Sequence, residues 1–77
     1  MNYIQLKQIA LGRFPEADTC YDCGGVLHFF NDHSDIIGRS IAINKETGEC
    51  MPFITAIDKG LVDDAYQVDF ETGISLV

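Results

Sequence analysis

The residues best suited to chemistry in this sequence are its cysteines, Cys20, Cys23 and Cys50. Cys20 and Cys23 form a C-x2-C pair, which Gly24 and Gly25 follow. Such a pair can direct two thiolates at one metal ion when glycine admits a tight turn behind it. A structural zinc ion needs four ligands, so other parts of the chain would have to complete the centre.

The third cysteine and a histidine are the residues that can complete this centre. His28 follows Cys23 by five residues, and Cys50 lies on an expected strand that can approach the same loop. We therefore predict Cys20, Cys23, Cys50 and His28 as a zinc site, which would stabilise a chain too small for a large core. The alternative is that these are ordinary core and loop side chains and that no cofactor is bound.

Redox and nucleophilic catalysis are less favoured. A thioredoxin-like pair needs its first cysteine at a helix N-terminus, which lowers the pKa of the thiol, but a β-rich segment follows Gly25. A nucleophilic trio would use Cys23, His28 or His33, and Asp35, and their spacing matches no such arrangement. We expect the protein not to be an enzyme.

The overall charge limits the classes of partner. The chain has 77 residues, with five Lys and Arg against twelve Asp and Glu and a formal net charge of −7. Phosphate groups are bound by clustered cations, and here the cations are scattered, so nucleic acid and anionic membranes are disfavoured. No apolar run approaches the roughly 18 residues of a membrane span, and we expect no signal peptide. An odd number of cysteines favours a reducing cytoplasm over a secreted disulfide framework.

Acidic residues crowd the last third of the chain. They are either a solvated face or a negative surface that speeds association with a basic partner. On the second interpretation we predict five partner-binding residues: Asp58, Asp63, Asp64, Asp69 and Glu71.

Hydrophobic periodicity predicts one domain, residues 1–77, of the α+β class: an N-terminal helix packed on a small antiparallel sheet of hairpins. The helix is expected over Asn2 to Phe14, with Pro15 after its end and the stem of Lys7 along its apolar face. A loop is expected over Glu16 to Gly25. The remaining expected elements are strands at Val26–Asn31, Arg39–Asn44 and Glu49–Phe53, a polar turn at Asn31–Asp35, a short helix near Thr55–Gly60 with a Thr55–Asp58 capping box, and a strand around Tyr66, Val68 and Phe70.

A Glu-Thr-Gly sequence occurs twice, within Ala42–Met51 and within Gln67–Leu76. In both places it lies between segments of strand-like alternation, and glycine supplies the positive φ that a tight hairpin turn requires. We predict two hairpins with the same turn chemistry.

The first of these hairpins resembles a known family. Residues 38–49 (GRSIAINKETGE) are similar to the hairpin of the YrhB-like immunity-protein family, and residues 25–30 (GVLHFF) are similar to its aromatic strand. That family consists of small cytosolic bacterial α+β proteins, grouped with the immunity partners of polymorphic toxins. The family's usual tryptophan is absent here, and Ser40 stands in place of its usual proline. The resemblance implies no catalytic residues.

The sequence therefore favours an acidic, non-catalytic protein-binding module, either immunity-like or a phage-type inhibitor, that neutralises or regulates a protein with a basic surface. One alternative is a zinc-stabilised structural module built on the C-x2-C loop. Another is a homo-oligomeric structural subunit that pairs through the strand near Pro52 or through residues 74–77.

Overall fold

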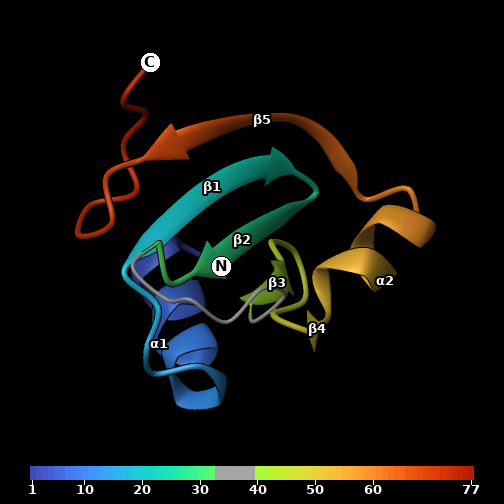
Figure 1. Cartoon of the computed structure of the whole chain (residues 1–77), viewed down its shortest axis with the longest axis horizontal. Helices are drawn as coiled ribbons and strands as arrows, with labels where there is room; N and C mark the ends of the chain where they lie inside the picture. Colours follow the sequence, from blue (N-terminus) through green and yellow to red (C-terminus); the bar gives the residue numbers. More distant parts are fainter. Residues whose placement is uncertain (33–39) are drawn as a thin grey trace.

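The computed structural model describes residues 1–32 and 40–77. It has the predicted α+β class, and its five strands form one antiparallel sheet in the order β4-β3-β2-β1-β5 (Figure 1). The elements along the chain are α1 (Tyr3–Arg13), β1 (Thr19–Gly24), β2 (Val26–Phe30), β3 (Ser40–Asn44), β4 (Cys50–Met51), α2 (Phe53–Asp58) and β5 (Val62–Val68).

Helix α1 is confirmed close to its predicted ends. The Asn2 side chain accepts a hydrogen bond from the N–H of Gln5, and the Gln5 side chain accepts one from the N–H of Asn2, which closes a capping box. The buried face of the helix carries Leu6 and Ala10. The Lys7 stem lies along apolar surface as predicted, but its ammonium group lies over the Phe70 ring, 4.4 Å from the centroid, rather than in open water.

The predicted loop over Glu16–Gly25 is wrong, because most of this segment is β1, which lies between β2 and β5. The Gly-Gly pair is a strand-to-strand turn and not the end of a long loop. Gly24 has a φ of 88°, and a Cβ on Gly25 would lie 2.7 Å from the carbonyl oxygen of Leu61. Glycine is therefore required where β1 turns into β2.

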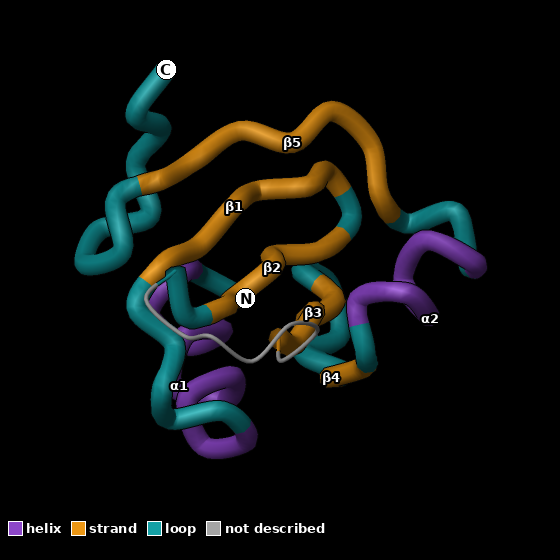
Figure 2. Tube along the Cα trace, in the orientation of Figure 1, coloured by secondary structure: helices purple, strands orange, loops and turns teal. Residues whose placement is uncertain are grey.

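The sheet is covered on both faces. One buried cluster unites α1 with one face through Leu6, Ala10, Leu27, Phe29 and Ile43 among others. A second cluster unites α2 with the opposite face: Cys23, Val26, Ala42, Met51 and Ala56. Successive residues of β2 and β3 divide between the clusters, as the alternation of a strand requires. Strand β2 is therefore covered on both sides, and Figure 2 shows the helices apart with strands between them.

The hairpin of β3 and β4 is confirmed. Its turn runs from Asn44 to Glu49 with Gly48 at a φ of 75°, and β4 forms one edge of the sheet before Pro52. The predicted turn at residues 31–35 and the start of the predicted strand at Arg39 fall largely outside the described residues.

Helix α2 starts earlier than predicted. Pro52 is its N-cap without a side-chain hydrogen bond, so the Thr55–Asp58 capping box is wrong and Thr55 lies inside the helix. Gly60, with a φ of 72°, follows the end of the helix. Strand β5 begins at Val62, earlier than predicted, and ends at Val68, so Phe70 belongs to the following turn.

Candidate functional site

The four predicted zinc ligands divide between the two faces of the sheet. Cys20 and Cys50 belong to the cluster on the α1 face. Cys23 belongs to the cluster on the α2 face, and the His28 ring stacks on Phe53 of α2. Zinc ligands lie about 2.0–2.3 Å from one ion, so these four residues do not form a common site. No group of three or more His, Cys, Asp or Glu side chains that could hold a metal is present in residues 1–32 and 40–77.

Cys20 and Cys23 lie on different faces because side chains along a strand alternate from one face to the other. Two residues three apart can face one ion from a loop or turn, but along β1 side chains alternate, and residues three apart point to opposite faces. Cys20 and Cys23 are therefore separated by the sheet itself. The spacing predicted a metal knuckle only because this segment was expected to be a loop.

All three thiols are held in the protonated form. Burial raises the pKa of Cys20 to about 12, and it also raises the pKa values of Cys23 and Cys50. The thiolate is the nucleophile and the metal ligand, so these cysteines are poorly suited to either role at neutral pH. Cys20 and Cys23 act here as small buried apolar groups, and Cys50 as a half-buried one.

His28 also acts as a packing residue. Its ring stacks on Phe53 with centroids 3.9 Å apart, and it lies 5.1 Å from the Phe30 centroid. Burial lowers the pKa of His28 to about 4, and its Nε2 has no hydrogen-bond partner within the described structure. A neutral imidazole between aromatic rings, with no described carboxylate to orient it, is not arranged as a catalytic base. His33 and Asp35 fall outside the described residues.

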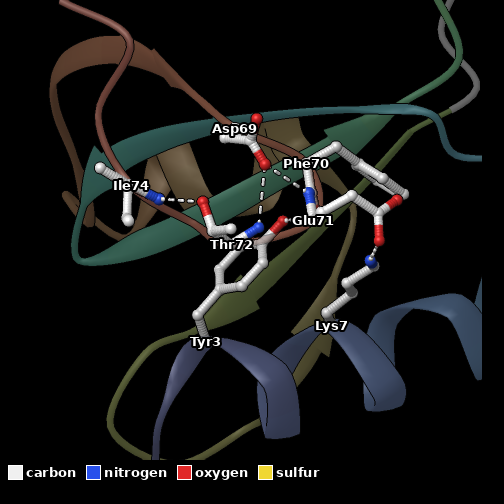
Figure 3. A network of polar contacts seen from close by, with 7 residues as sticks. All are labelled: Tyr3, Lys7, Asp69, Phe70, Glu71, Thr72 and Ile74. Atoms are coloured by element: carbon white, nitrogen blue, oxygen red, sulfur yellow. Dashed lines mark hydrogen bonds and ion pairs between the residues drawn. The ribbon is translucent and has the colours of Figure 1, made fainter.

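Two of the five predicted acidic residues have structural roles in the turn after β5 (Figure 3). The Asp69 carboxylate accepts hydrogen bonds from the N–H groups of Thr72, at 3.0 Å, and Glu71, at 2.9 Å, and these bonds lower the pKa of Asp69. The Glu71 carboxylate pairs with the Lys7 ammonium at 3.4 Å. Part of the negative charge predicted to meet a partner is therefore used within the chain.

The other three, Asp58, Asp63 and Asp64, are exposed, and we call them the open acidic patch. Asp58 is the last residue of α2, and Asp63 and Asp64 lie on β5 just after the turn that follows it. None of the three makes an ion pair within residues 1–32 and 40–77. The described lysines pair elsewhere: Lys7 with Glu71, Lys45 with Asp22 and Lys59 with Glu49.

Strand β5 carries two residues of this patch, Asp63 and Asp64, at an edge of the sheet. Five consecutive residues, Asp63–Gln67, are exposed. Between the pairs Gly24↔Val62 and Asp22↔Tyr66 the register shifts, so that Asp63, Asp64 and Ala65 together oppose the single residue Cys23. Such a bulge bends a strand and disrupts its ladder locally. The acidic side chains are thus held on a bent, solvent-facing part of the edge.

Apolar side chains next to the patch were not predicted as surface. Ile54 and Ile57 lie on the solvent side of α2, with exposed fractions of 68% and 48%. Ala56 is the buried residue of α2, and Phe53 packs partly against the same cluster. The sequence signal that could have identified the buried face of α2 is the three-residue spacing of Phe53 and Ala56. That spacing leaves Ile54 and Ile57 on the exposed side of the helix.

The two segments proposed for self-association lie at opposite edges of the sheet. At one edge β4 has only two residues and ends before Pro52. At the other edge, residues 74–77 reach β5 through the isolated antiparallel bridge Val68↔Ser75.

No protein-family model, curated protein or solved structure matches the chain. No helix in the described part of the chain is long and apolar enough to cross a membrane. The resemblance to the YrhB-like family stays a prediction.

Proposed function

We propose that this chain is a non-catalytic binding module that neutralises or regulates a protein partner with a basic surface. The observation that carries the proposal is the open acidic patch, because Asp58, Asp63 and Asp64 are exposed and have no ion-pair partner among the described residues. Exposed carboxylates at the end of α2 and on the edge strand β5 create a negative potential that speeds encounter with cations on a partner. The exposed Ile54 and Ile57 add apolar area beside that charge.

The chemistry of the remaining candidates supports a role without catalysis. The raised pKa values of the cysteines suppress thiolate formation, and the lowered pKa of His28 leaves it neutral and packed against Phe53. Buried, protonated thiols persist in a reducing cytoplasm, which is our proposed compartment. Together with the resemblance of the first hairpin, this favours a bacterial immunity protein or a phage-encoded inhibitor.

The test is the kinetics of association with an isolated partner. A partner captured from bacterial lysate would be identified, purified alone and measured against the wild type at several salt concentrations. We expect Asp63→Asn with Asp64→Asn to slow association roughly tenfold at low salt, because charges at the rim of an interface act mainly on the on-rate.

The matched control is Asp32→Asn with Glu46→Gln, which removes the same amount of charge from exposed residues of other segments. We expect this variant to associate at nearly the wild-type rate. Equal slowing by both variants would mean that only net charge matters, and salt-independent association would remove the electrostatic basis of the proposal.

A further inference from the structure

The outer side of β5 is already paired at one end, although the pairing segment is not itself a strand. The chain's own tail pairs there: the N–H of Leu76 donates to the C=O of Gln67 at 3.0 Å, and the N–H of Asp69 donates to the C=O of Ile74 at 2.8 Å. These bonds flank the bridge Val68↔Ser75. The tail therefore shows that this edge accepts an added antiparallel strand, and it occupies the edge only from Gln67 onward.

The part of β5 before Gln67 has no strand on its outer side within the described structure. The bulge leaves Asp63, Asp64 and Ala65 opposite one residue of β1, so the ladder between the two strands is locally disrupted there. Asp64 directs its N–H to the Asp63 carboxylate at 2.9 Å. Water hydrates exposed backbone groups of this kind, and an extended peptide can replace that water by forming a ladder.

Charge selects which peptide can do so. An acidic edge discourages pairing with another copy of the same chain, because each copy has a formal net charge of −7. The same carboxylates attract an extended segment that carries lysine or arginine. Tyr66, which is 39% exposed at the end of this stretch, offers an aromatic face to such a cation.

We propose that β5 binds a short, extended, basic segment of the partner protein as an added strand along residues 63–66. This inference rests on the proposed function and specifies how the partner is held. Main-chain hydrogen bonds to β5 supply affinity, and the open acidic patch supplies selectivity for basic side chains.

The experiment uses a fluorescent hexapeptide of alternating lysine and valine as its probe, with binding followed by anisotropy and by amide chemical shifts of the protein. We expect saturable binding that shifts the amides of residues 62–67. The same peptide with every backbone nitrogen methylated keeps its charge but cannot donate to a ladder from either side. It should bind at least tenfold more weakly.

A charge-reversed protein gives the second arm. Asp63→Lys with Asp64→Lys should lose affinity for the lysine–valine peptide and gain affinity for a glutamate–valine peptide of equal length. Both positions are exposed, so the variant is expected to fold, which circular dichroism verifies.

The outcomes separate the two proposals. Equal affinity for the methylated and unmethylated peptides would overturn strand addition and leave a purely electrostatic binding surface. Absence of peptide binding by a protein that still binds its basic partner would overturn it too. A dimer formed without peptide, with amides 62–67 protected, would assign this edge to a second copy instead. If the wild-type protein bound the lysine–valine peptide no better than the glutamate–valine peptide, the proposed function itself would be overturned.

Discussion

The same turn is built twice in this molecule, at residues 44–49 and at residues 69–74. In the first turn the Asn44 side-chain oxygen accepts hydrogen bonds from the N–H of Glu46, at 2.8 Å, and of Thr47, at 3.1 Å. The N–H of Gly48 donates to the Asn44 carbonyl at 2.8 Å, and the N–H of Glu49 donates to the Thr47 hydroxyl at 3.2 Å. Side chain and backbone of one residue thus organise the whole turn.

The second turn repeats this pattern with Asp69 in place of asparagine. Its carboxylate accepts the N–H groups of Glu71, at 2.9 Å, and Thr72, at 3.0 Å. The N–H of Gly73 donates to the Asp69 carbonyl at 2.7 Å, and the N–H of Ile74 donates to the Thr72 hydroxyl at 3.2 Å. The prediction of two hairpin turns with shared chemistry is confirmed.

The surroundings of the two turns differ. Figure 3 shows the second turn against α1, where the Tyr3 hydroxyl donates to the Phe70 carbonyl at 2.6 Å and Lys7 approaches both Phe70 and Glu71. The first turn is tied to the β1–β2 turn instead: the Lys45 ammonium group pairs with Asp22 at 3.0 Å, and the Lys45 N–H donates to the Gly25 carbonyl at 3.1 Å. The comparison teaches that local sequence specifies the geometry of a turn, whereas contacts from distant residues decide which part of the fold the turn is tied to.

Substitutions of Gly48 and Gly73 should give the largest difference in stability between the two turns. Both have positive φ, near 75°, where a Cβ adds strain of about 1–2 kcal/mol. At Gly73 the new Cβ would also collide with the Tyr3 ring, whereas at Gly48 it would meet the Met1 sulfur at 2.9 Å, and exposed Met1 can move aside. We expect Gly73→Ala to lower the free energy of unfolding by about 2–4 kcal/mol and Gly48→Ala by about 1–2 kcal/mol.

Urea unfolding of both variants measures this difference. Tyr3→Ala combined with Gly73→Ala is the control, because removal of the ring should eliminate the part of the loss that is due to the collision. Equal losses for the two single variants would show that backbone strain alone matters and that the contact with Tyr3 does not.

The features that the sequence predicted well are local ones. The helix ends at Asn2 and Phe14 and the turn at residues 44–49 follow from capping and turn residues within a few positions of each other. Strand β1 was missed because its own residues, TCYDCG, show no strand-like alternation, and of its two neighbours β2 is local whereas β5 lies 38 to 48 residues further along the chain. Once β1 is a strand, the metal site predicted from Cys20 and Cys23 cannot form.

The acidic residues illustrate the same limit within the candidate site. All five could be picked out by composition, but the sequence does not say which of them bind within the chain. Glu71 pairs with Lys7 across 64 positions, so its role depends on the folded arrangement of α1 and the second turn. Asp58, Asp63 and Asp64 have no such described partner and remain open to solvent.

Removing one hydroxyl tests how the second turn is tied to α1. Tyr3→Phe keeps the ring over Gly73 but loses the 2.6 Å hydrogen bond to the Phe70 carbonyl. Burial raises the pKa of Tyr3, so this hydroxyl donates at all physiological pH values. We expect a loss of about 1 kcal/mol in the free energy of unfolding. Thermal unfolding monitored by circular dichroism measures the loss.

Tyr66→Phe is the matched control, since Tyr66 is partly exposed and its hydroxyl makes no hydrogen bond with any described residue. Its stability should change very little. A loss at position 3 no larger than that at position 66 would mean that the second turn is held by packing alone.

The smallest expected difference between the turns is their response to acid. Asn44 does not titrate, but Asp69 has a lowered pKa because the N–H groups of Thr72 and Glu71 donate to its carboxylate. The unfolded chain therefore binds a proton at a higher pH than the folded one, and this contribution to stability is lost as the pH falls below about 4. We expect Asp69→Asn to flatten this acid loss, and Asn44→Asp to introduce a similar loss in the first turn.

Urea unfolding between pH 7 and pH 3 measures both effects as differences from the wild type. His28, with a pKa lowered to about 4 by burial, destabilises the fold as the pH falls from 6.5 toward that value. This occurs in every variant, so it cancels in the difference. If Asp69→Asn retained the full acid loss of the wild type, the carboxylate would not be the group that holds the second turn. If Asn44→Asp made the free energy of unfolding fall at low pH, the presence of Asn or Asp at the first position of each turn would account for the different responses of the two turns to acid.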